Sequence, residues 1–256
     1  MPAVCPPLYY LQIFSIFAVS FLLIEVYLTK FKMSEDLYLE QLKLGPMENF
    51  IYILGSKSTR EVTLIDPAWE IDLLFKHLEE NDLKLSSILV THYHPDHIGG
   101  GMMGQSIPGI AEIMAKQPVK IYVNKHEAEG VKKVTGVSDS DLQLVDSGDH
   151  LQIGENDIEF LHTPGHTPGS QCFSVNKNLV SGDTLFINGC GRVDLPGSDS
   201  DQMYHSLQHL CSLPDDTILY PGHHYSEEKS ASLAETKSQN VYLNISDINR
   251  WRQIMG

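Results

Sequence analysis

The segment His92-Tyr93-His94-Pro95-Asp96-His97 places three histidines and one aspartate within six residues. It follows an apolar run at 88–90, which predicts a short buried strand. Residues two apart on an extended chain point the same way, so His92 and His94 can face one ion. Asp96 and His97 follow where the chain turns and are expected on the opposite side of a pocket. Imidazole and carboxylate groups bind zinc and similar ions, so the segment predicts a metal site.

Three further candidate ligands follow predicted strands, in turns that contain glycine or proline. They are His166 in Pro164-Gly165-His166, Asp183 in Ser181-Gly182-Asp183 and His223 in Pro221-Gly222-His223. Glycine and proline allow backbone turns that hold such side chains inward. Each turn alone is a weak signal, because an aspartate after glycine usually caps a turn. Together with the first segment they indicate one shared site.

The composition is that of a globular protein with a marked negative charge. The 256 residues suffice for one large domain or two small ones, and 42% are hydrophobic. A net charge of −15 argues against nucleic acid as a partner. The four cysteines form no C-x-x-C pair and are expected to be reduced core thiols; they are Cys5, Cys172, Cys190 and Cys211.

From Met33 onward, short strand-like runs mix with helical segments. Strands are predicted at 52–54, 62–65, 88–90, 119–123, 151–153, 158–161, 171–175, 179–180 and 217–220. Apolar spacing predicts a helix at 71–78, and further helices are expected at about 200–211 and about 226–237. The elements do not alternate strictly, as a Rossmann fold or a barrel would require. Residues 33–256 are therefore predicted to form one catalytic domain.

Residues 1–32 form a hydrophobic N-terminal segment. Between Pro7 and Leu28 the strongly polar residues are Gln12 and Glu25. About 22 such residues are long enough to cross a hydrocarbon core of roughly 30 Å. The segment lacks the basic start and cleavage site of a secretory signal, and Lys30 and Lys32 would keep the rest in the cytoplasm. Two interpretations stay open: a membrane anchor with membrane contact through residues 7–28, or an extension that the working protein lacks. Both place the catalytic domain in the cytoplasm.

The order H-x-H-x-D-H, His, Asp, His resembles the metallo-β-lactamase superfamily over about residues 36–238. The resemblance implies an α+β fold, a four-layer αββα sandwich in which two mixed sheets lie face to face with helices outside. It implies a first metal held by His92, His94 and His166, and a second held by Asp96, His97 and His223. Asp183 would bridge the two. Two divalent metal ions per chain are therefore expected, with zinc favoured and iron or manganese as alternatives. The lactamases of antibiotic resistance usually carry cysteine at the Asp183 position, which argues against that branch.

The resemblance also implies hydrolytic chemistry. Two metals roughly 3.5–4 Å apart share and acidify a water, which gives a bridging hydroxide at neutral pH. Asp96 would orient this hydroxide through its second oxygen and is the predicted catalytic residue. Asp66, after the strand at 62–65, has two open interpretations. It either contacts a ligand imidazole or starts an Asp-Pro turn.

The segment Asn188-Gly189-Cys190-Gly191-Arg192-Val193-Asp194 resembles hydroxyacylglutathione hydrolase (glyoxalase II) and the persulfide dioxygenases. In the hydrolase, a basic residue at the Arg192 position and a tyrosine at the Tyr225 position contact glutathione, so both are predicted to bind substrate. Alternatively, Arg192 pairs with Asp194. The resemblance implies a small-molecule substrate, a thioester such as an acyl-glutathione or another thiol conjugate.

Several departures leave the reaction open. About 30 residues follow Tyr225, where glyoxalase II carries a helical domain that completes its glutathione site. Asp194 replaces a second glutathione-contacting tyrosine, and the loop at 101–119 is longer than expected. The main alternative is a persulfide dioxygenase with one iron held by His92, His166 and Asp183. The intact ligand set argues against a non-catalytic binding module. The acidic charge argues against a nuclease. Nothing in the sequence indicates an oligomeric state.

Overall fold

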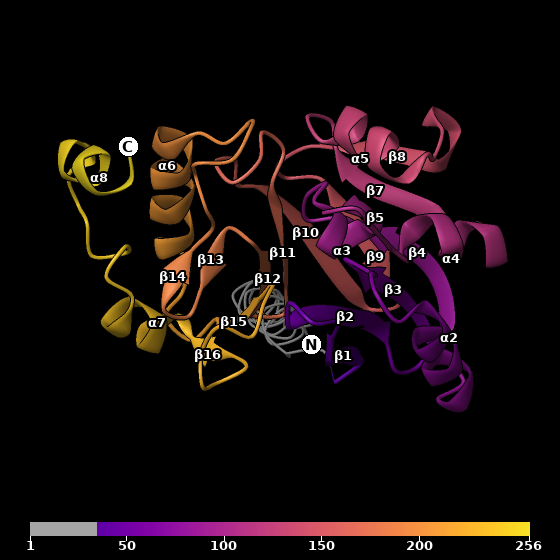
Figure 1. The fold of residues 1–256 in the computed structure, drawn as a ribbon. Helices are drawn as coiled ribbons and strands as arrows, with labels where there is room; N and C mark the ends of the chain where they lie inside the picture. Colours follow the sequence, from indigo (N-terminus) through magenta and orange to yellow (C-terminus); the bar gives the residue numbers. More distant parts are fainter. Residues whose placement is uncertain (1–34) are drawn as a thin grey trace, which may run out of the picture. The chain divides into compact units, whose positions relative to one another are not determined.

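The computed structural model describes residues 35–256. Two six-stranded sheets form its centre (Figure 1). The first sheet has the order β1 (Leu37–Leu44), β2 (Asn49–Ser56), β3 (Glu61–Ile65), β4 (Lys84–Leu89), β7 (Lys120–Asn124), β8 (Leu142–Val145). The second has the order β16 (Ala231–Ser232), β15 (Ile218–Pro221), β12 (Asn178–Gly182), β11 (Gln171–Val175), β10 (Asn156–His162), β9 (His150–Ile153).

Both sheets are mixed, as the family resemblance implied. In the first sheet, β3, β4, β7 and β8 run parallel, while β1 and β2 add an antiparallel edge. In the second, β12 and β15 form the parallel pair within an otherwise antiparallel sheet. Two short hairpins complete the strands: β5 (Gly100–Met102) with β6 (Gln105–Ile107), and β13 (Leu185–Phe186) with β14 (Gly189–Cys190).

The helices lie on the outer faces of the sheets and complete the αββα arrangement (Figure 1). The first half of the domain contains α2 (Ile71–Glu80), α3 (Pro95–Ile98), α4 (Ile110–Lys116), α5 (Ala128–Thr135) and a 3-10 turn (Asp139–Asp141). The second half contains α6 (Ser200–Cys211), α7 (Leu233–Gln239) and α8 (Ile248–Met255). The α+β fold class predicted from the sequence is confirmed.

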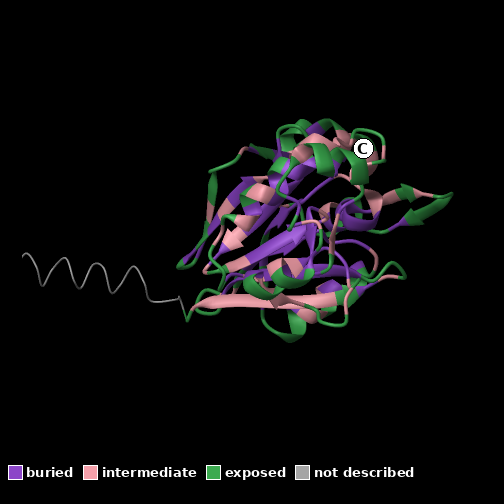
Figure 2. Ribbon diagram, turned by 90° about the vertical axis from the view of Figure 1, so that its left-hand side faces the viewer, coloured by how far each residue is buried: buried purple, intermediate pink, exposed green. Residues whose placement is uncertain are grey.

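Three apolar clusters hold these layers together, and Figure 2 shows the buried strands between exposed helices and loops. The cluster between the sheets includes Phe50, Ile65, Phe160 and Phe173. A second joins the first sheet to α2, α4 and α5, and a third joins the second sheet to α6, α7 and α8. The first sheet is covered on one face by helices and on the other by the second sheet. The strand β2 is therefore buried along its whole length.

The helix predicted at about 226–237 exists, but its predicted start was wrong. The helix α7 begins instead at Leu233, where Ser232 and Glu235 form a capping box: the Glu235 N–H donates to Oγ of Ser232, and the Ser232 N–H donates to Oε2 of Glu235. The sequence analysis also missed α8. Asp247 caps its first turn, and the buried Trp251 ring donates a 2.8 Å hydrogen bond to the carbonyl of Ser200.

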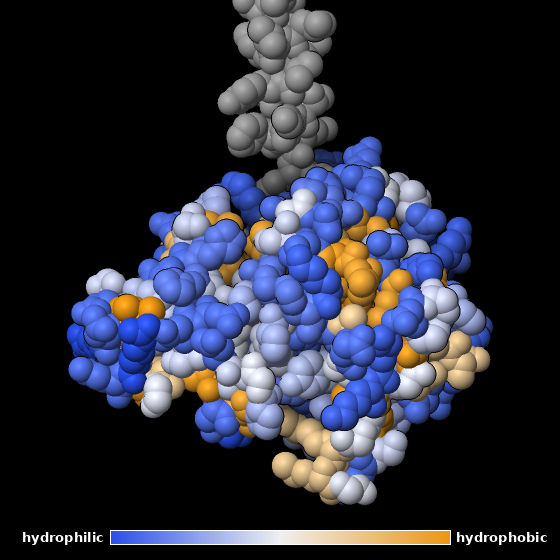
Figure 3. All heavy atoms as spheres, turned by 90° about the horizontal axis from the view of Figure 1, so that it is seen from above, coloured by the Kyte–Doolittle hydropathy of each residue, from blue (hydrophilic) through white to orange (hydrophobic). Residues whose placement is uncertain are grey.

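Within residues 35–256, no helix has the length and apolarity needed to cross a membrane. The predicted hydrophobic segment at 1–32, its boundary at Met33 and Cys5 lie outside the described residues. Cys172, Cys190 and Cys211 are free thiols, but only Cys172 is buried as a core thiol; Cys190 and Cys211 are half-buried. The face of the molecule shown in Figure 3 is largely hydrophilic, with apolar side chains gathered in small patches.

Candidate metal centre

The H-x-H-x-D-H segment changes from an extended chain to a single helical turn. His92 and His94 lie in the stretch after β4, and Pro95 occupies the first position of α3. Asp96 and His97 lie on that turn, which ends at Gly99 with φ of 84°. Proline is favoured at the first helical position because its missing N–H would have no partner there. The change of direction puts His94 and Asp96 in different candidate ligand groups.

The remaining candidate ligands come from loops of the second sheet. His166 lies between β10 and β11, while Asp183 and His223 follow the parallel strands β12 and β15. Parallel neighbours end at the same edge, so Asp183 and His223 emerge side by side. Gly222 permits this approach, because a Cβ there would lie 2.4 Å from Oδ1 of Asp183. Gly182 has φ of 49° and packs against Thr91 in the same way.

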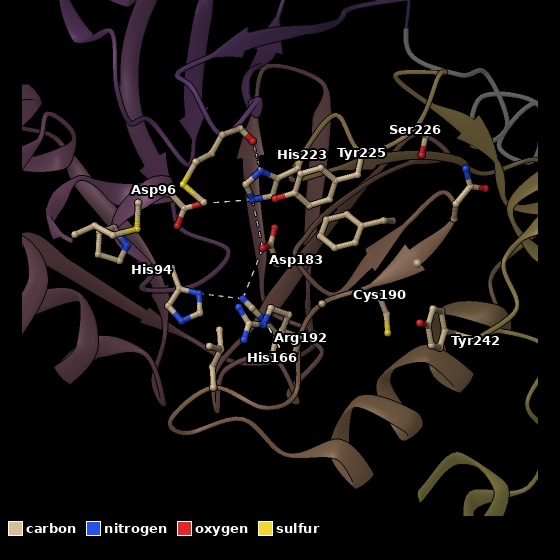
Figure 4. A pocket seen from close by; sticks show the side chains of 18 of the residues that line it. His94, Asp96, His166, Asp183, Cys190, Arg192, His223, Tyr225, Ser226 and Tyr242 are labelled. Carbon is tan, nitrogen blue, oxygen red and sulfur yellow. Dashed lines mark hydrogen bonds and ion pairs between the residues drawn. The ribbon is translucent and has the colours of Figure 1, made fainter. Parts of the chain in front are cut away.

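The structure brings all seven predicted side chains together. Figure 4 shows five of them: His94, Asp96, His166, Asp183 and His223. Nδ1 of His94 lies 3.0 Å from Nε2 of His166, and Nε2 of His97 lies 3.1 Å from Nε2 of His223. Asp183 stands between the pairs: Oδ2 is 3.6 Å from Nε2 of His166 and 3.4 Å from Nε2 of His223, and Oδ1 is 3.3 Å from Nε2 of His97. Among the described residues, three groups could each hold a metal ion, and two of them are the predicted sets: His92, His94, His166 and Asp96, His97, His223. The third is Asp66, His92, His97.

These donors fit divalent ions. Two imidazole nitrogens bound to a tetrahedral zinc lie roughly 3.3 Å apart, close to the separations in both pairs. Among the described residues, Nε2 of His92 and Oδ1 of Asp183 are buried without a hydrogen-bond partner. A buried polar atom without a partner is costly unless something binds it. Both atoms face the site, so a bound cation would satisfy them.

The electrostatics divide the site in two. Burial and the neighbouring imidazoles hold the pKa of His92 well below its usual value and that of His94 at about 4, so both are neutral at pH 7. On the other side, burial lowers the pKa of His223, yet Asp183 and Asp96 raise it to about 9. Burial raises the pKa of Asp183, yet His97 and His223 hold it well below its usual value. The carboxylates are thus ionised and favour positive charge beside them.

Outer hydrogen bonds fix which ring nitrogen faces the centre. In four of the histidines Nδ1 bonds outward and leaves Nε2 for an ion, as metal-binding imidazoles usually do. The partners of Nδ1 are Oγ1 of Thr91 at 2.9 Å for His92, Oδ2 of Asp66 at 3.0 Å for His97, the carbonyl of Arg192 at 2.9 Å for His166, and the carbonyl of Met47 at 3.0 Å for His223. His94 instead turns Nδ1 toward the centre.

Asp66 contacts a ligand imidazole, the first of the two interpretations left open. Its Oδ2 accepts the Nδ1 proton of His97, and it also accepts the Thr91 hydroxyl at 2.5 Å. The Thr91 proton is therefore committed to Asp66, so Oγ1 of Thr91 accepts the Nδ1 proton of His92. One buried carboxylate thereby orients a histidine of each group, His97 directly and His92 through Thr91.

Asn49 and Trp69 contact the centre and were missed by the sequence analysis. The amide nitrogen of Asn49 donates to Oδ2 of Asp96 at 3.0 Å, and the Trp69 indole N–H donates to Oδ1 of Asn49 at 3.1 Å. Because an indole can only donate, it fixes the orientation of the Asn49 amide. The same indole N–H lies 3.0 Å from the carbonyl of Asp96. A polar residue at the start of a buried strand was the available signal for Asn49.

A cavity of about 640 Å³ opens over the centre and contains both predicted substrate-binding residues. Arg192 forms a two-pronged ion pair with Asp194, with both N···O distances 2.8 Å, as the alternative interpretation expected. The Tyr225 ring stacks on His223, with ring centres 4.6 Å apart. Burial, Asp183 and Asp96 raise the pKa of Tyr225 to about 12, so its hydroxyl remains a hydrogen-bond donor at neutral pH.

Comparison with known proteins agrees with this architecture. The model of the metallo-β-lactamase superfamily matches residues 44–223, and the chain belongs to this superfamily. A probable polyketide biosynthesis zinc-dependent hydrolase, BaeB, of Bacillus velezensis is 31% identical over 77% of this chain and 82% of its own. A hydroxyacylglutathione hydrolase of Tolumonas auensis is 32% identical over 80% and 74%. The human mitochondrial persulfide dioxygenase ETHE1 is 32% identical over 81% and 76%.

Proposed function

We propose that this chain is a metal-dependent hydrolase of a thioester such as an acyl-glutathione, which it splits into an acid and a thiol. The observation that carries the proposal is the complete donor set, two three-residue groups on either side of Asp183, at the base of a cavity. The similarity to a hydroxyacylglutathione hydrolase supports it, because hydroxyacyl-glutathiones are thioesters. Two bound divalent ions would supply Lewis-acid activation of water and of the substrate carbonyl.

The proposed ligand roles follow the two groups. His92, His94 and His166 would hold one ion, Asp96, His97 and His223 the other, and Asp183 both. Oδ2 of Asp96 faces His97 and His223, both at 3.4 Å, and accepts the Asn49 amide. No described residue hydrogen-bonds to Oδ1 of Asp96, so this oxygen can accept a proton from the attacking water and orient it. A thiol has a pKa of about 8.5, so it leaves as a thiolate without a strong acid.

Replacing Asn49 by alanine should lower kcat/KM for thioester hydrolysis roughly 10- to 100-fold, since a hydrogen bond to a charged group contributes about 1.5–3 kcal/mol. The Asp96 carboxylate would then lose the hydrogen bond that helps to fix its rotation, so its Oδ1 would be held less well toward the attacking water. Thiol release measured with a thiol reagent, beside metal content and thermal unfolding, checks this. Asn178→Ala is the matched control, because Asn178 bonds carbonyls at 175 and 176, within its own β-turn. Equal activity in both variants would contradict the role given to Asn49.

A second candidate function is the persulfide dioxygenase reaction. It is favoured by the similarity to the human enzyme and by the position of Asp183 beside His166. Two histidines and a carboxylate, here His92, His166 and Asp183, are a donor set that suits non-haem iron. Imidazole and carboxylate accept zinc as well as iron, so the donor set is compatible with both reactions.

The two reactions differ in oxygen consumption. Zinc-loaded and iron-loaded protein should each be assayed for thiol release from S-lactoylglutathione and for oxygen uptake with glutathione persulfide. We expect thiol release without oxygen uptake, and chelator-treated protein serves as the blank. Oxygen uptake by the iron form, with no thioesterase activity in either form, would replace the proposed hydrolase with the dioxygenase.

A further inference from the structure

We propose that the acyl half of the substrate is an apolar chain, bound by a methionine surface consisting of Met47, Met102 and Met103. The inference rests on the proposed thioester hydrolysis and specifies its substrate class. All three methionines line the cavity over the metal centre. None of them belongs to the predicted ligand set or to the predicted substrate-binding residues.

The methionine surface lies on one side of the centre. The Met47 carbonyl accepts the Nδ1 proton of His223, which places residue 47 beside the Asp96, His97, His223 group. Met102 ends β5, the strand that follows α3 directly, and Met103 lies in the turn of that hairpin. These residues come from the first half of the domain, as do His94 and Asp96 in the same cavity lining.

Apart from the candidate metal ligands, the polar side chains of the cavity come from the second half, which also contributes the apolar Phe186 and Leu195. Arg192, Asn188, Ser226 and Tyr225 line it from loops of the second sheet. Figure 4 shows His94 and Asp96 on one side of Asp183, and Cys190, Ser226 and Tyr242 on the other. A thioester cleaved at the centre must extend to both sides. Its polar thiol half therefore fits the side of Arg192, and its acyl half lies along the methionines.

Charge supports this division. Arg192 is the one Lys or Arg side chain in the described lining of this cavity, and Asp194 already neutralises it. Apart from the ions of the proposed metal centre, the methionine side has no Lys or Arg in its described lining that could hold a charged acyl group. An acyl chain with a carboxylate or phosphate would therefore lose its hydration there without gaining an ionic partner, whereas an alkyl chain loses nothing.

The exposure of apolar side chains at the cavity also supports an apolar acyl chain as its occupant. Across residues 35–256, seven large hydrophobic side chains are exposed, and three of them, Met47, Met103 and Tyr225, line this one cavity. Met103 is 97% exposed. Exposed apolar side chains gathered at one opening mark a binding surface. Methionine suits such a surface because its unbranched thioether adapts to chains of different length.

The test uses straight-chain acyl thioesters of one thiol, glutathione, from acetyl to decanoyl, with lactoyl-glutathione as a polar reference. We expect kcat/KM to rise with chain length, by up to about fourfold for each methylene buried. The double variant Met47→Gln, Met103→Gln should flatten this rise. Both side chains are exposed, so the variant should fold, and unchanged thermal unfolding would verify that. Leu144→Gln is the control, because the Leu144 side chain is also exposed but lies on β8, outside the cavity.

The outcomes separate the two proposals. A flat or falling dependence on chain length, with lactoyl-glutathione still hydrolysed, would overturn the apolar acyl site and leave the thioester hydrolase standing. A rise that persists unchanged in the double variant would show that the methionine surface does not bind the chain, and would also overturn this inference. Hydrolysis of none of the thioesters by metal-loaded protein would instead overturn the proposed function itself.

Discussion

An Asp183→Asn variant is expected to lose bound metal and hydrolytic activity together. Both carboxylate oxygens of Asp183 face the two predicted ligand groups, with Oδ1 toward His97 and Oδ2 toward His166 and His223. An asparagine is neutral and turns an N–H₂ donor toward one of them, so it neither offsets the charge of two cations nor binds both. We expect metal content to fall from about two per chain to one or none, and kcat/KM by at least about 100-fold.

Elemental analysis of protein purified without chelator, beside thiol release, measures both quantities. Asp216→Asn is the matched control, because Asp216 pairs with Lys177 on the surface and lies outside both groups. We expect it to retain full metal content and activity. Wild-type protein with no metal after growth in supplemented medium would contradict the metal centre, and an Asp183→Asn variant that kept two ions would contradict the bridging role.

The sequence predicted which side chains lie together at the candidate centre because its strongest signals are local. The spacing of His92, His94, Asp96 and His97 fixes their directions through the geometry of a strand end and one helical turn. His166, Asp183 and His223 each stand in a turn whose glycine or proline is visible in the sequence. The sequence does not show which distant elements pack against each other. Asn49 and Asp96 are 47 residues apart, and no local pattern encodes their contact.

The fold was predicted in class and less well in detail. Strands buried on both faces, such as the one at 171–175, are visible as apolar runs. The edge strand β1 is only half-buried and alternates weakly, so it was missed. The C-terminal helix α8 is short, and besides its Asp247 cap it depends on the tertiary contacts of Trp251 with α6, which no local pattern shows. The Arg192–Asp194 pair was anticipated because the residues are two apart.

Replacing Asp66 by asparagine is expected to weaken the binding of both ions. Oδ2 of Asp66 accepts protons from His97 and from Thr91, and Thr91 in turn orients His92. An amide in its place would face one of these donors with its own N–H₂ group. Loss of such an outer partner typically costs 10- to 100-fold in metal affinity, and here one histidine of each group would be affected. Competition with a chromophoric chelator measures the two affinities separately.

Thr91→Val makes this prediction specific. Valine has nearly the shape of threonine but removes the link to His92, while the Asp66–His97 hydrogen bond remains. We therefore expect Thr91→Val to weaken one affinity and Asp66→Asn to weaken two. Equal losses in the two variants would mean that Asp66 acts by stabilising the domain as a whole rather than through the two histidines, and thermal unfolding of the metal-free variants would distinguish these cases.

The division of each ligand group between the two sheets has a consequence for how the protein is made. His97 and His223 belong to one group but are 126 residues apart in the chain. On the ribosome, the first sheet and its H-x-H-x-D-H segment emerge long before β15 pairs with β12 and brings His223 into place. The first group has all its side chains only after His166 has been made, and the second only after His223 has been made. We therefore expect the two candidate sites to form one after the other during synthesis, and the second of them only when most of the chain has emerged.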